Sequence, residues 1–219
     1  MRLKHVKGAE EIIKKGTYYI ENPKEYKGSW NKVFNNNNPI YIEIGMGKGD
    51  FIIENALKYP EINFIGIEKF DSVIVRAIQK SNELELYNLK LIRMDAMEIE
   101  EVFNKEIDRI YLNFSDPWPK ERHAKRRLTS PIFLAKYDLI FKSSANIIMK
   151  TDNNPLFEYS LETLKEAGYE LLEITRDLYS EDIADNIATE YEKKFVSRGI
   201  NINRLYGIKP KNNWIFKKK

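Results

Sequence analysis

The sequence predicts a doubly wound α/β fold built on a mostly parallel sheet. From residue 40 to residue 167, short apolar runs alternate with stretches whose apolar residues recur at helical spacing. Short continuous apolar runs are typical of strands that are buried on both faces of a parallel sheet. Crossovers between parallel strands are right-handed almost without exception, so such a chain winds helices onto both faces of the sheet.

Each element follows from its own apolar pattern. The short apolar runs predict strands at Ile40–Ile44, Asn63–Ile67, Leu89–Arg93, Arg109–Phe114 and Asn146–Met149. The amphipathic stretches between them predict helices at Asp50–Lys58, Asp71–Asn82, Pro131–Phe141 and Pro155–Ala167. Beyond Gly168 the pattern changes, and we interpret three segments as further strands, the last two joined by a turn at Arg198-Gly199: Tyr169–Ile174, Glu190–Val196 and Ile202–Ile208.

Length and composition favour a single domain spanning residues 1–219. A chain of 219 residues can bury a substantial core, and 42% hydrophobic with 32% charged residues is typical of a globular protein. Residues 1 to about 35 show no clear periodicity and end in the loop signal of four asparagines before Pro39. We therefore interpret residues 1–35 as an N-terminal extension.

Composition also excludes several classes of site. The chain has no cysteine, so disulfides and thiolate zinc sites are excluded, and a reducing cytosol fits. Only two histidines are present, which argues against a histidine-based metal site or triad. No apolar run approaches the roughly 18 residues of a membrane span, and the start shows no signal-peptide pattern. We expect a cytoplasmic protein with no membrane partner and no metal.

A glycine-rich loop joins the first predicted strand to the first helix. It reads Glu43-Ile44-Gly45-Met46-Gly47-Lys48-Gly49, and its glycines permit tight turns and close approach of a ligand. Glu68 closes the second strand 21 residues after Gly47, where an acid can bind both ribose hydroxyls of an adenosine cofactor. Asp95 follows the third strand, where it can meet an adenine amino group.

Two cofactors compete for this pattern. Dinucleotide sites usually carry GxGxxG, whereas the spacing here is GxGxG. A carboxylate such as Glu43 is unfavourable beside a pyrophosphate but suits the ammonium and sulfonium of S-adenosylmethionine. Spacing and charge therefore favour S-adenosylmethionine. In the alternative interpretation the glycines only make a turn, and Glu68 and Asp95 cap helices.

The most informative stretch runs from Tyr111 to Leu128. An apolar run leads to Asp116, and Pro117 and Pro119 restrict the backbone on either side of Trp118. Residues 119–127 carry a net charge of +4 in a chain whose total is +3, so the positive charge is local. A local positive block beside an acid indicates an enzyme that acts on nucleic acid. Its cations are Lys120, Arg122, Lys125, Arg126 and Arg127, with His123 among them.

These residues identify a family. The segment from Asn113 to Leu128, NFSDPWPKERHAKRRL, resembles the signature of the tRNA (guanine-N7-)-methyltransferases. Thr189–Phe195 with Gly199 is similar to a second signature of that family, and Thr151-Asp152-Asn153 to a third. The resemblance runs from about Gly16 to Ile208, and it departs at Asn201, where the family often has proline.

The resemblance implies a seven-stranded, Rossmann-like methyltransferase fold that transfers a methyl group to a variable-loop guanosine of tRNA. It implies that Glu43, Gly45, Gly47, Glu68, Asp95 and Asp116 bind S-adenosylmethionine or act at the active site. It also implies substrate contacts, with Arg122, His123, Lys125, Arg126 and Arg127 on the RNA, and with Lys120, Asp152, Thr189, Glu190, Tyr191 and Glu192 at the acceptor site.

The chemistry of the reaction leaves the role of Asp116 open. Guanine N7 has a lone pair and no proton, so it attacks a sulfonium methyl without a general base, and the enzyme mainly has to orient the reactants. Asp116 can stabilise the cationic product or accept hydrogen bonds from guanine N–H groups; it can also be a turn residue before Pro117. The open alternatives are a methyltransferase of another substrate class and a non-catalytic RNA-binding protein. The sequence does not decide between monomer and homodimer.

Overall fold

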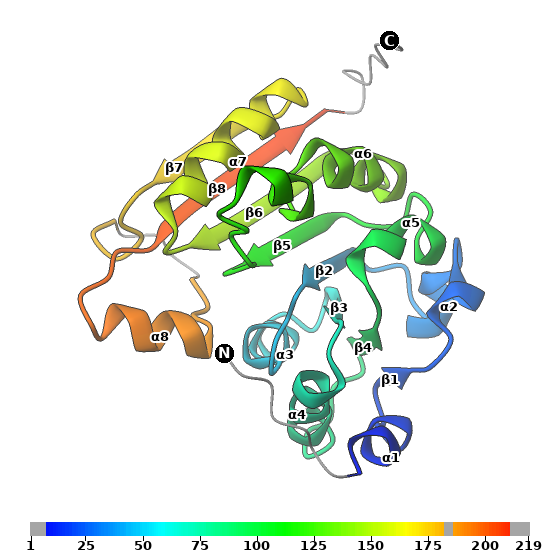
Figure 1. Cartoon of the computed structure of the whole chain (residues 1–219). Coiled ribbons are helices and arrows are strands. Elements are labelled where there is room, and N and C mark those ends of the chain that lie inside the picture. The colour runs from blue at the N-terminus through cyan, green and yellow to red at the C-terminus, as the bar shows by residue number, and fades with distance from the viewer. Residues whose placement is uncertain (1–7, 182–185, 211–219) are drawn as a thin grey trace.

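The computed structural model describes residues 8–181 and 186–210 and consists of one mixed sheet covered by helices (Figure 1). The strand order is β1-β4-β3-β2-β5-β6-β8-β7. The strands are β1 Tyr19–Ile20, β2 Ile40–Ile44, β3 Asn63–Glu68, β4 Leu89–Arg93, β5 Arg109–Asn113, β6 Ala145–Thr151, β7 Glu170–Thr175 and β8 Asn203–Lys209. All pairings from β1 to β6 are parallel, whereas β8 runs antiparallel to both β6 and β7.

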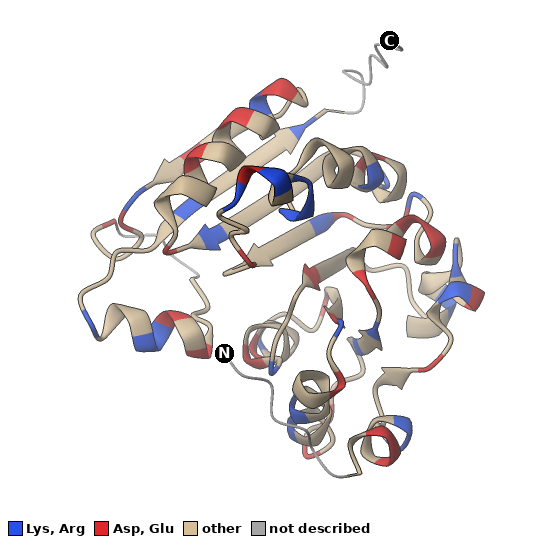
Figure 2. Cartoon of the chain, viewed as in Figure 1, with Lys and Arg blue, Asp and Glu red and all other residues tan. Residues whose placement is uncertain are grey.

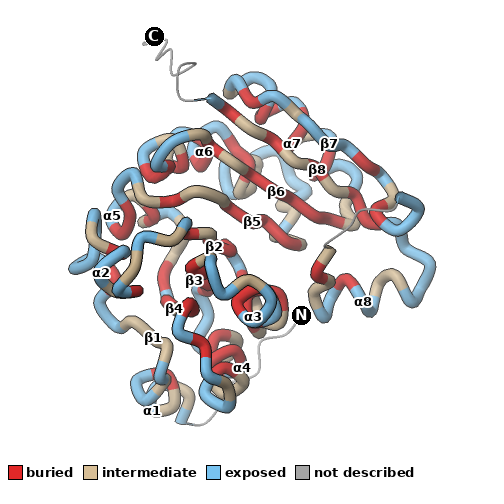
Figure 3. The backbone as a smooth tube through the Cα atoms, turned by 180° about the vertical axis from the view of Figure 1, so that it is seen from behind, coloured by how far each residue is buried: buried red, intermediate tan, exposed pale blue. Residues whose placement is uncertain are grey.

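Helices cover both faces of the sheet, as a doubly wound fold requires (Figures 1 and 3). Helices α3 and α4 lie on one face, and α5, α6 and α7 lie on the other. The α-helices are α1 Ala9–Lys14, α2 Trp30–Phe34, α3 Asp50–Lys58, α4 Asp71–Ser81, α5 Ile99–Val102, α6 Pro131–Ile140, α7 Asn154–Glu166 and α8 Glu190–Val196. Three 3-10 helices complete the described part: η1 Pro23–Tyr26, η2 Ala96–Glu98 and η3 Glu121–Arg126.

The alternation of side chains along β2 explains the two cores. Ile40, Ile42 and Ile44 point into the core beneath α6 and α7. Tyr41 lies on the other face, packed against the core that contains the residues of α3 and α4. Glu43 is on the same face of the strand as the partly buried Tyr41 and is itself buried. β2 therefore places a buried carboxylate at its penultimate residue, directly before the glycine loop.

The predicted fold is confirmed; helices α1, α2 and α5 are additional to the prediction, and two further differences concern strands. β1 is an additional two-residue strand beside β4, so the sheet has eight strands rather than seven. The segment Glu190–Val196, predicted as a strand, is helix α8. Its first turn contains a capping box, in which the Thr189 side chain accepts a hydrogen bond from the Glu192 N–H and the Glu192 carboxylate accepts one from the Thr189 N–H. This T-x-x-E signature was in the sequence and outweighs the alternation of acids and aromatics.

The described part of the N-terminal extension packs against the core. Trp30 of α2 is fully buried, and its indole N–H donates to the carbonyl of Val102 at 3.0 Å. The same ring lies 5.3 Å from that of Phe103, centroid to centroid. Residues 1–7 of the predicted extension lie outside the described residues. Within the described part of the chain, no helix has the length and apolar character needed to span a membrane.

Candidate active site

The candidate site lies where the winding of the sheet reverses. The chain builds β2, β3 and β4 outward in one direction, then returns to place β5 on the other side of β2. Ligands of doubly wound sheets bind beyond the carboxyl ends of the strands at such a switch point. The glycine loop after β2 and the Asp116 segment after β5 both lie at this position.

The three glycines of the loop have different roles. Gly45, Gly47 and Gly49 all have positive φ, at 77°, 59° and 81°. A Cβ added to Gly45 or Gly47 would meet nothing within 4 Å, so open space faces this part of the loop. At Gly49 an added Cβ would lie 2.7 Å from the Cβ of Ala77, so this glycine allows α3 to pack closely on α4. The first two glycines therefore leave space for a ligand.

Glu68 fixes the shape of the glycine loop. One carboxylate oxygen accepts a hydrogen bond from the Gly47 N–H at 3.1 Å. The other accepts from the N–H groups of Lys69 and Phe70 at 2.8 and 3.0 Å. Burial raises the pKa of this carboxyl, although these three hydrogen bonds act in the opposite direction. About four lone-pair sites are available on a carboxylate, so Glu68 retains capacity for a ligand hydroxyl.

Glu43 is the buried acid of the site. Its Oε1 accepts a hydrogen bond from the side-chain amide of Asn113, the last residue of β5, at 2.8 Å. Burial raises its pKa to about 7, although the Asn113 hydrogen bond and the charge of Lys150 act in the opposite direction. Among the described residues, neither Glu43 Oε2 nor Asn113 Oδ1 has a hydrogen-bond partner. Two buried acceptors without donors fit the ammonium group of an amino-acid moiety.

Asp95 follows β4, which lies two strands from β2 in the strand order. It is the N-cap of η2, where one oxygen accepts from the Met97 N–H at 3.0 Å. The other oxygen accepts from the Lys69 ammonium at 2.6 Å. Burial raises its pKa, but the hydrogen bond and charge of Lys69 outweigh this, so the net shift is downward. Asp95 is therefore ionised and held in place.

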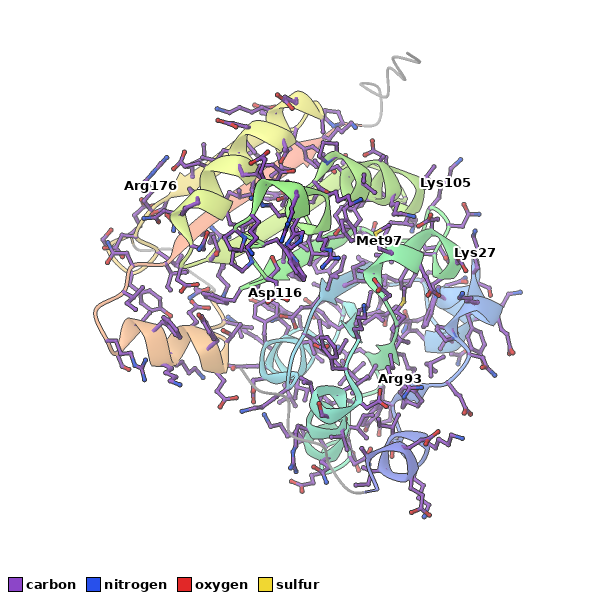
Figure 4. All side chains as sticks on the ribbon, viewed as in Figure 1. Lys27, Arg93, Met97, Lys105, Asp116 and Arg176 are labelled. Carbon is purple, nitrogen blue, oxygen red and sulfur yellow. The ribbon has the colours of Figure 1, made fainter. Side chains whose placement is uncertain are left out.

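Asp116 is exposed and lies three residues beyond the end of β5 (Figure 4). Its segment is held in an unusual backbone conformation, because Phe114 has φ 51° and Trp118 has φ 42°. The charge of Asp116 contributes to the raised pKa of Glu68. The two carboxylates therefore lie near each other: Glu68 accepts three backbone hydrogen bonds, and the Asp116 carboxylate has no hydrogen-bond or ion-pair partner among the described residues.

The cations predicted to contact RNA gather on η3, directly after Asp116 (Figure 2). Lys120, Arg122 and Lys125 are exposed, and none of their side chains has a hydrogen-bond or ion-pair partner among residues 8–181 and 186–210. Arg126 is also exposed, with its guanidinium 4.8 Å from the centre of the Trp118 ring. His123 meets the edge of the same ring at 5.8 Å. Arg127 is only partly exposed, and its guanidinium points inward.

Helix α8 brings a third group of predicted residues to the same end of the sheet. Glu190 pairs with Lys48 of the glycine loop at 2.7 Å. The Tyr191 ring, 42% exposed, lies 4.9 Å from the ring of Phe114, and its hydroxyl donates to Asp152 at 3.3 Å. These contacts place the outer face of α8 against the segment that carries Asp116.

Glu192 and Thr189, which the resemblance implies as substrate contacts, have their side-chain oxygens bonded within the protein. Glu192 is fully buried and forms an ion pair with Lys150 of β6 at 2.5 Å. It also accepts hydrogen bonds from Tyr179 and Asn186. The Thr189 hydroxyl is used as the helix cap. Both side chains therefore help to fix α8, and their role as substrate contacts stays a prediction.

Comparisons with known proteins agree with this architecture. A family model described as "Putative methyltransferase" matches residues 37–205. The solved structure of an antibiotic-related methyltransferase is similar to 90% of this chain and 98% of its own, with a TM-score of 0.64 at 17% identity. The 16S rRNA methyltransferase KamB covers 84% of this chain and 93% of its own, with a TM-score of 0.64 at 13% identity. The fold and the family model together define a methyltransferase.

Curated relatives are more specific. The tRNA (guanine-N(7)-)-methyltransferase of Lachnoclostridium phytofermentans is 51% identical over 213 residues, which is 96% of this chain and 100% of the relative. Its counterparts from Listeria innocua and Bacillus cytotoxicus are 51% and 50% identical, over 94% and 96% of this chain, and each is covered over 97% of its length. The chain belongs to the tRNA (guanine-N7-)-methyltransferase family.

Proposed function

We propose that this chain transfers the methyl group of S-adenosylmethionine to N7 of a variable-loop guanosine in tRNA, in the cytoplasm. The observation that carries the proposal is the position of Asp116. A carboxylate with no partner among residues 8–181 and 186–210 is held at the switch point of the sheet, between the glycine loop and a block of exposed cations. Cofactor, acceptor base and RNA backbone can therefore meet at one place.

The residues of the glycine-loop side fit S-adenosylmethionine. The unpartnered oxygens of Glu43 and Asn113 suit its ammonium group, the space over Gly45 and Gly47 suits close backbone approach, and Glu68 suits the ribose hydroxyls. When bound there, S-adenosylmethionine supplies an electrophilic methyl group on a sulfonium. The protein has no proton to remove, because guanine N7 already carries a free lone pair.

Asp116 then acts on the guanine. An exposed carboxylate can accept hydrogen bonds from the N1–H and amino groups of guanine and so orient N7 toward the methyl group. Methylation leaves the purine cationic, and a fixed carboxylate nearby stabilises the charge as it develops. Orientation and charge stabilisation both depend on the same anion. They therefore fail together when its charge is removed.

The RNA backbone is bound by the exposed cations of η3. Lys120, Arg122 and Lys125 have no acidic partner among the described residues, so their charges are available for phosphates. Arg126 stacks on Trp118 and presents its charge at the same surface. Each phosphate that these cations neutralise makes tRNA binding more sensitive to salt.

The first test is Asp116→Asn, which keeps the shape and one acceptor oxygen but removes the charge. We expect the single-turnover rate of methyl transfer, at saturating tRNA and cofactor, to fall by about 10²–10³-fold, or roughly 2.7–4 kcal/mol, as for loss of a preorganised electrostatic group. The dissociation constant for tRNA should change little, since Asp116 is one contact among many. Label should enter guanine N7 in the wild type and nowhere else in the RNA. A wild-type rate for the variant would reduce Asp116 to a turn residue.

A further inference from the structure

Arg127 differs from the other four cations of its block. Its Nε donates to the carbonyl of Pro117 at 3.2 Å and its Nη2 donates to the carbonyl of Trp118 at 3.1 Å. The guanidinium also lies 4.3 Å from the centre of the Tyr159 ring on α7. The Arg127 side chain therefore connects the backbone next to Asp116 to helix α7.

The segment around Asp116 requires such support. Two of the four non-glycine residues with positive φ in the described chain, Phe114 and Trp118, flank Asp116 on either side. Backbone conformations of this kind cost on the order of 1–3 kcal/mol each and persist only where the surroundings hold them. On the strand side, the Phe114 N–H donates to the carbonyl of Lys150 at 2.8 Å. On the far side, the two donors of Arg127 are the side-chain hydrogen bonds that the described residues make to the backbone of Pro117 and Trp118, beside the ring contacts of Arg126 and His123.

We infer that Arg127 is a positioning residue that fixes Asp116 through the carbonyls of Pro117 and Trp118, and that it does not bind RNA phosphate. This inference rests on the role of Asp116 proposed above. The forked guanidinium matches two neighbouring acceptors at once, whereas a lysine ammonium is a point donor on a flexible stem. The Tyr159 ring packs against the guanidinium and fixes its orientation. The charge of Arg127 is incidental to its function, and its geometry is essential.

A charge-conserving variant separates this role from phosphate binding. Arg127→Lys keeps the positive charge but loses the fork, whereas Arg127→Ala loses both. We expect both variants to lower the single-turnover rate at saturating tRNA on the order of 10²-fold, because a shift of about 1 Å in a catalytic group has that effect. The dissociation constant for tRNA and its dependence on salt should stay at wild-type values. A phosphate contact would instead lower the salt slope of Arg127→Ala by about one unit and preserve the saturated rate; that result would overturn the inference.

A double-variant cycle tests whether Arg127 acts through Asp116. If it does, Asp116→Asn combined with Arg127→Ala should be no slower than Asp116→Asn alone. If the two losses multiply, Arg127 acts independently of Asp116 and the inference is wrong. A wild-type rate for Asp116→Asn itself would remove the proposed role of Asp116, whereas a slow Asp116→Asn with a wild-type Arg127→Ala would remove only the role of Arg127.

Two further variants control for folding. Tyr159→Ala removes the ring from α7 without altering the charge of the block, and it should reproduce the slow rate with unchanged tRNA affinity. Arg176→Ala is the matched control, because Arg176 also places its guanidinium near a ring of α7, 5.6 Å from Phe157, yet lies well away from Asp116 (Figure 4). It should leave the rate at the wild-type value. Calorimetric affinity for S-adenosylmethionine, measured on every variant, verifies that the glycine loop is intact.

Discussion

The two sides of the site are built in different ways. On the glycine-loop side, the side chain of Glu68 bonds only to backbone N–H groups near in sequence, at most 21 residues away. On the α8 side, the tethers are side-chain pairs between distant segments: Lys48 with Glu190 over 142 residues, and Lys150 with Glu192 over 42. The contacts of Glu68 are therefore almost local, whereas the tethers of α8 exist only when the whole sheet is assembled. Glu43 and Asn113, 70 residues apart, join the strand before the glycine loop to β5 and are the long-range contact on that side.

The largest expected effect on the α8 side comes from the buried ion pair between Lys150 and Glu192. Lys150→Met leaves the fully buried Glu192 carboxylate without its cation. Removing one partner of a buried pair typically destabilises a protein by about 3–5 kcal/mol. We expect a loss of this size in urea unfolding, accompanied by a raised dissociation constant for tRNA as α8 loosens.

The matched control is the exposed pair between Lys193 and Glu54, 3.9 Å apart. Lys193→Met should cost no more than about 1 kcal/mol, as is usual for exposed pairs. Equal losses for the two variants would show that α8 is not held by Lys150. If Lys150→Met combined with Glu192→Leu regains stability, the penalty comes from the unpaired charge rather than from lost packing.

The same contrast explains what the sequence could predict. The strand-loop-helix pattern around Gly45 and Gly47 is local, so periodicity and spacing were enough to place the glycine loop. α8 was misassigned because alternating acids and aromatics mimic a strand, although the capping box of Thr189 and Glu192 was readable. The burial of Glu192 and the inward turn of Arg127 were not readable, because each depends on partners that only the folded sheet brings close.

Asn113 was missed for the same reason. In the sequence it is only the first residue of the Asp116 signature, yet in the structure it is the hydrogen-bond partner of Glu43 across the switch point, 70 residues away in sequence. A polar residue at the end of an apolar strand that lies next to the glycine-loop strand is the signal that could have found it.

Glu68→Ala tests the glycine-loop side of the site. It leaves the N–H of Gly47 without its acceptor and removes the support of Lys69 and Phe70. We expect the calorimetric affinity for S-adenosylmethionine to fall at least about tenfold, and unfolding stability to fall by about 1–3 kcal/mol for the unsatisfied donors. Affinity for tRNA should be retained, because the contacts of α8 and η3 do not involve Glu68. The control is Glu85→Ala, an exposed acid that has no contact with the loop in the described part of the chain. Unchanged cofactor affinity in Glu68→Ala would place the ribose elsewhere.

The smallest expected effect concerns the protonation of Glu43, the residue where the two sides meet. Burial raises its pKa to about 7, against the opposing effects of Asn113 and Lys150. The folded protein therefore binds a proton that the unfolded chain has released above its ordinary pKa of 4.5, so this group's contribution to stability falls as pH rises from about 4.5 to 7. Cofactor binding has the opposite dependence, because an ammonium beside Glu43 favours the ionised form.

Affinity for S-adenosylmethionine should therefore increase with pH between about 5.5 and 7, by at most about tenfold per unit, and level off above that range. Glu43→Gln cannot ionise, so its affinity should be lower at pH 7 and independent of pH across the same interval. Calorimetry in buffers of different ionisation enthalpy measures the proton directly, since the wild type should release about one proton on binding near pH 6 and the variant none. Should the wild type bind equally well at pH 5.5 and 7 with no proton released, Glu43 would already be ionised in the free protein. The negative charge of Glu43 would then be stabilised by Lys150 and Asn113 without the cofactor.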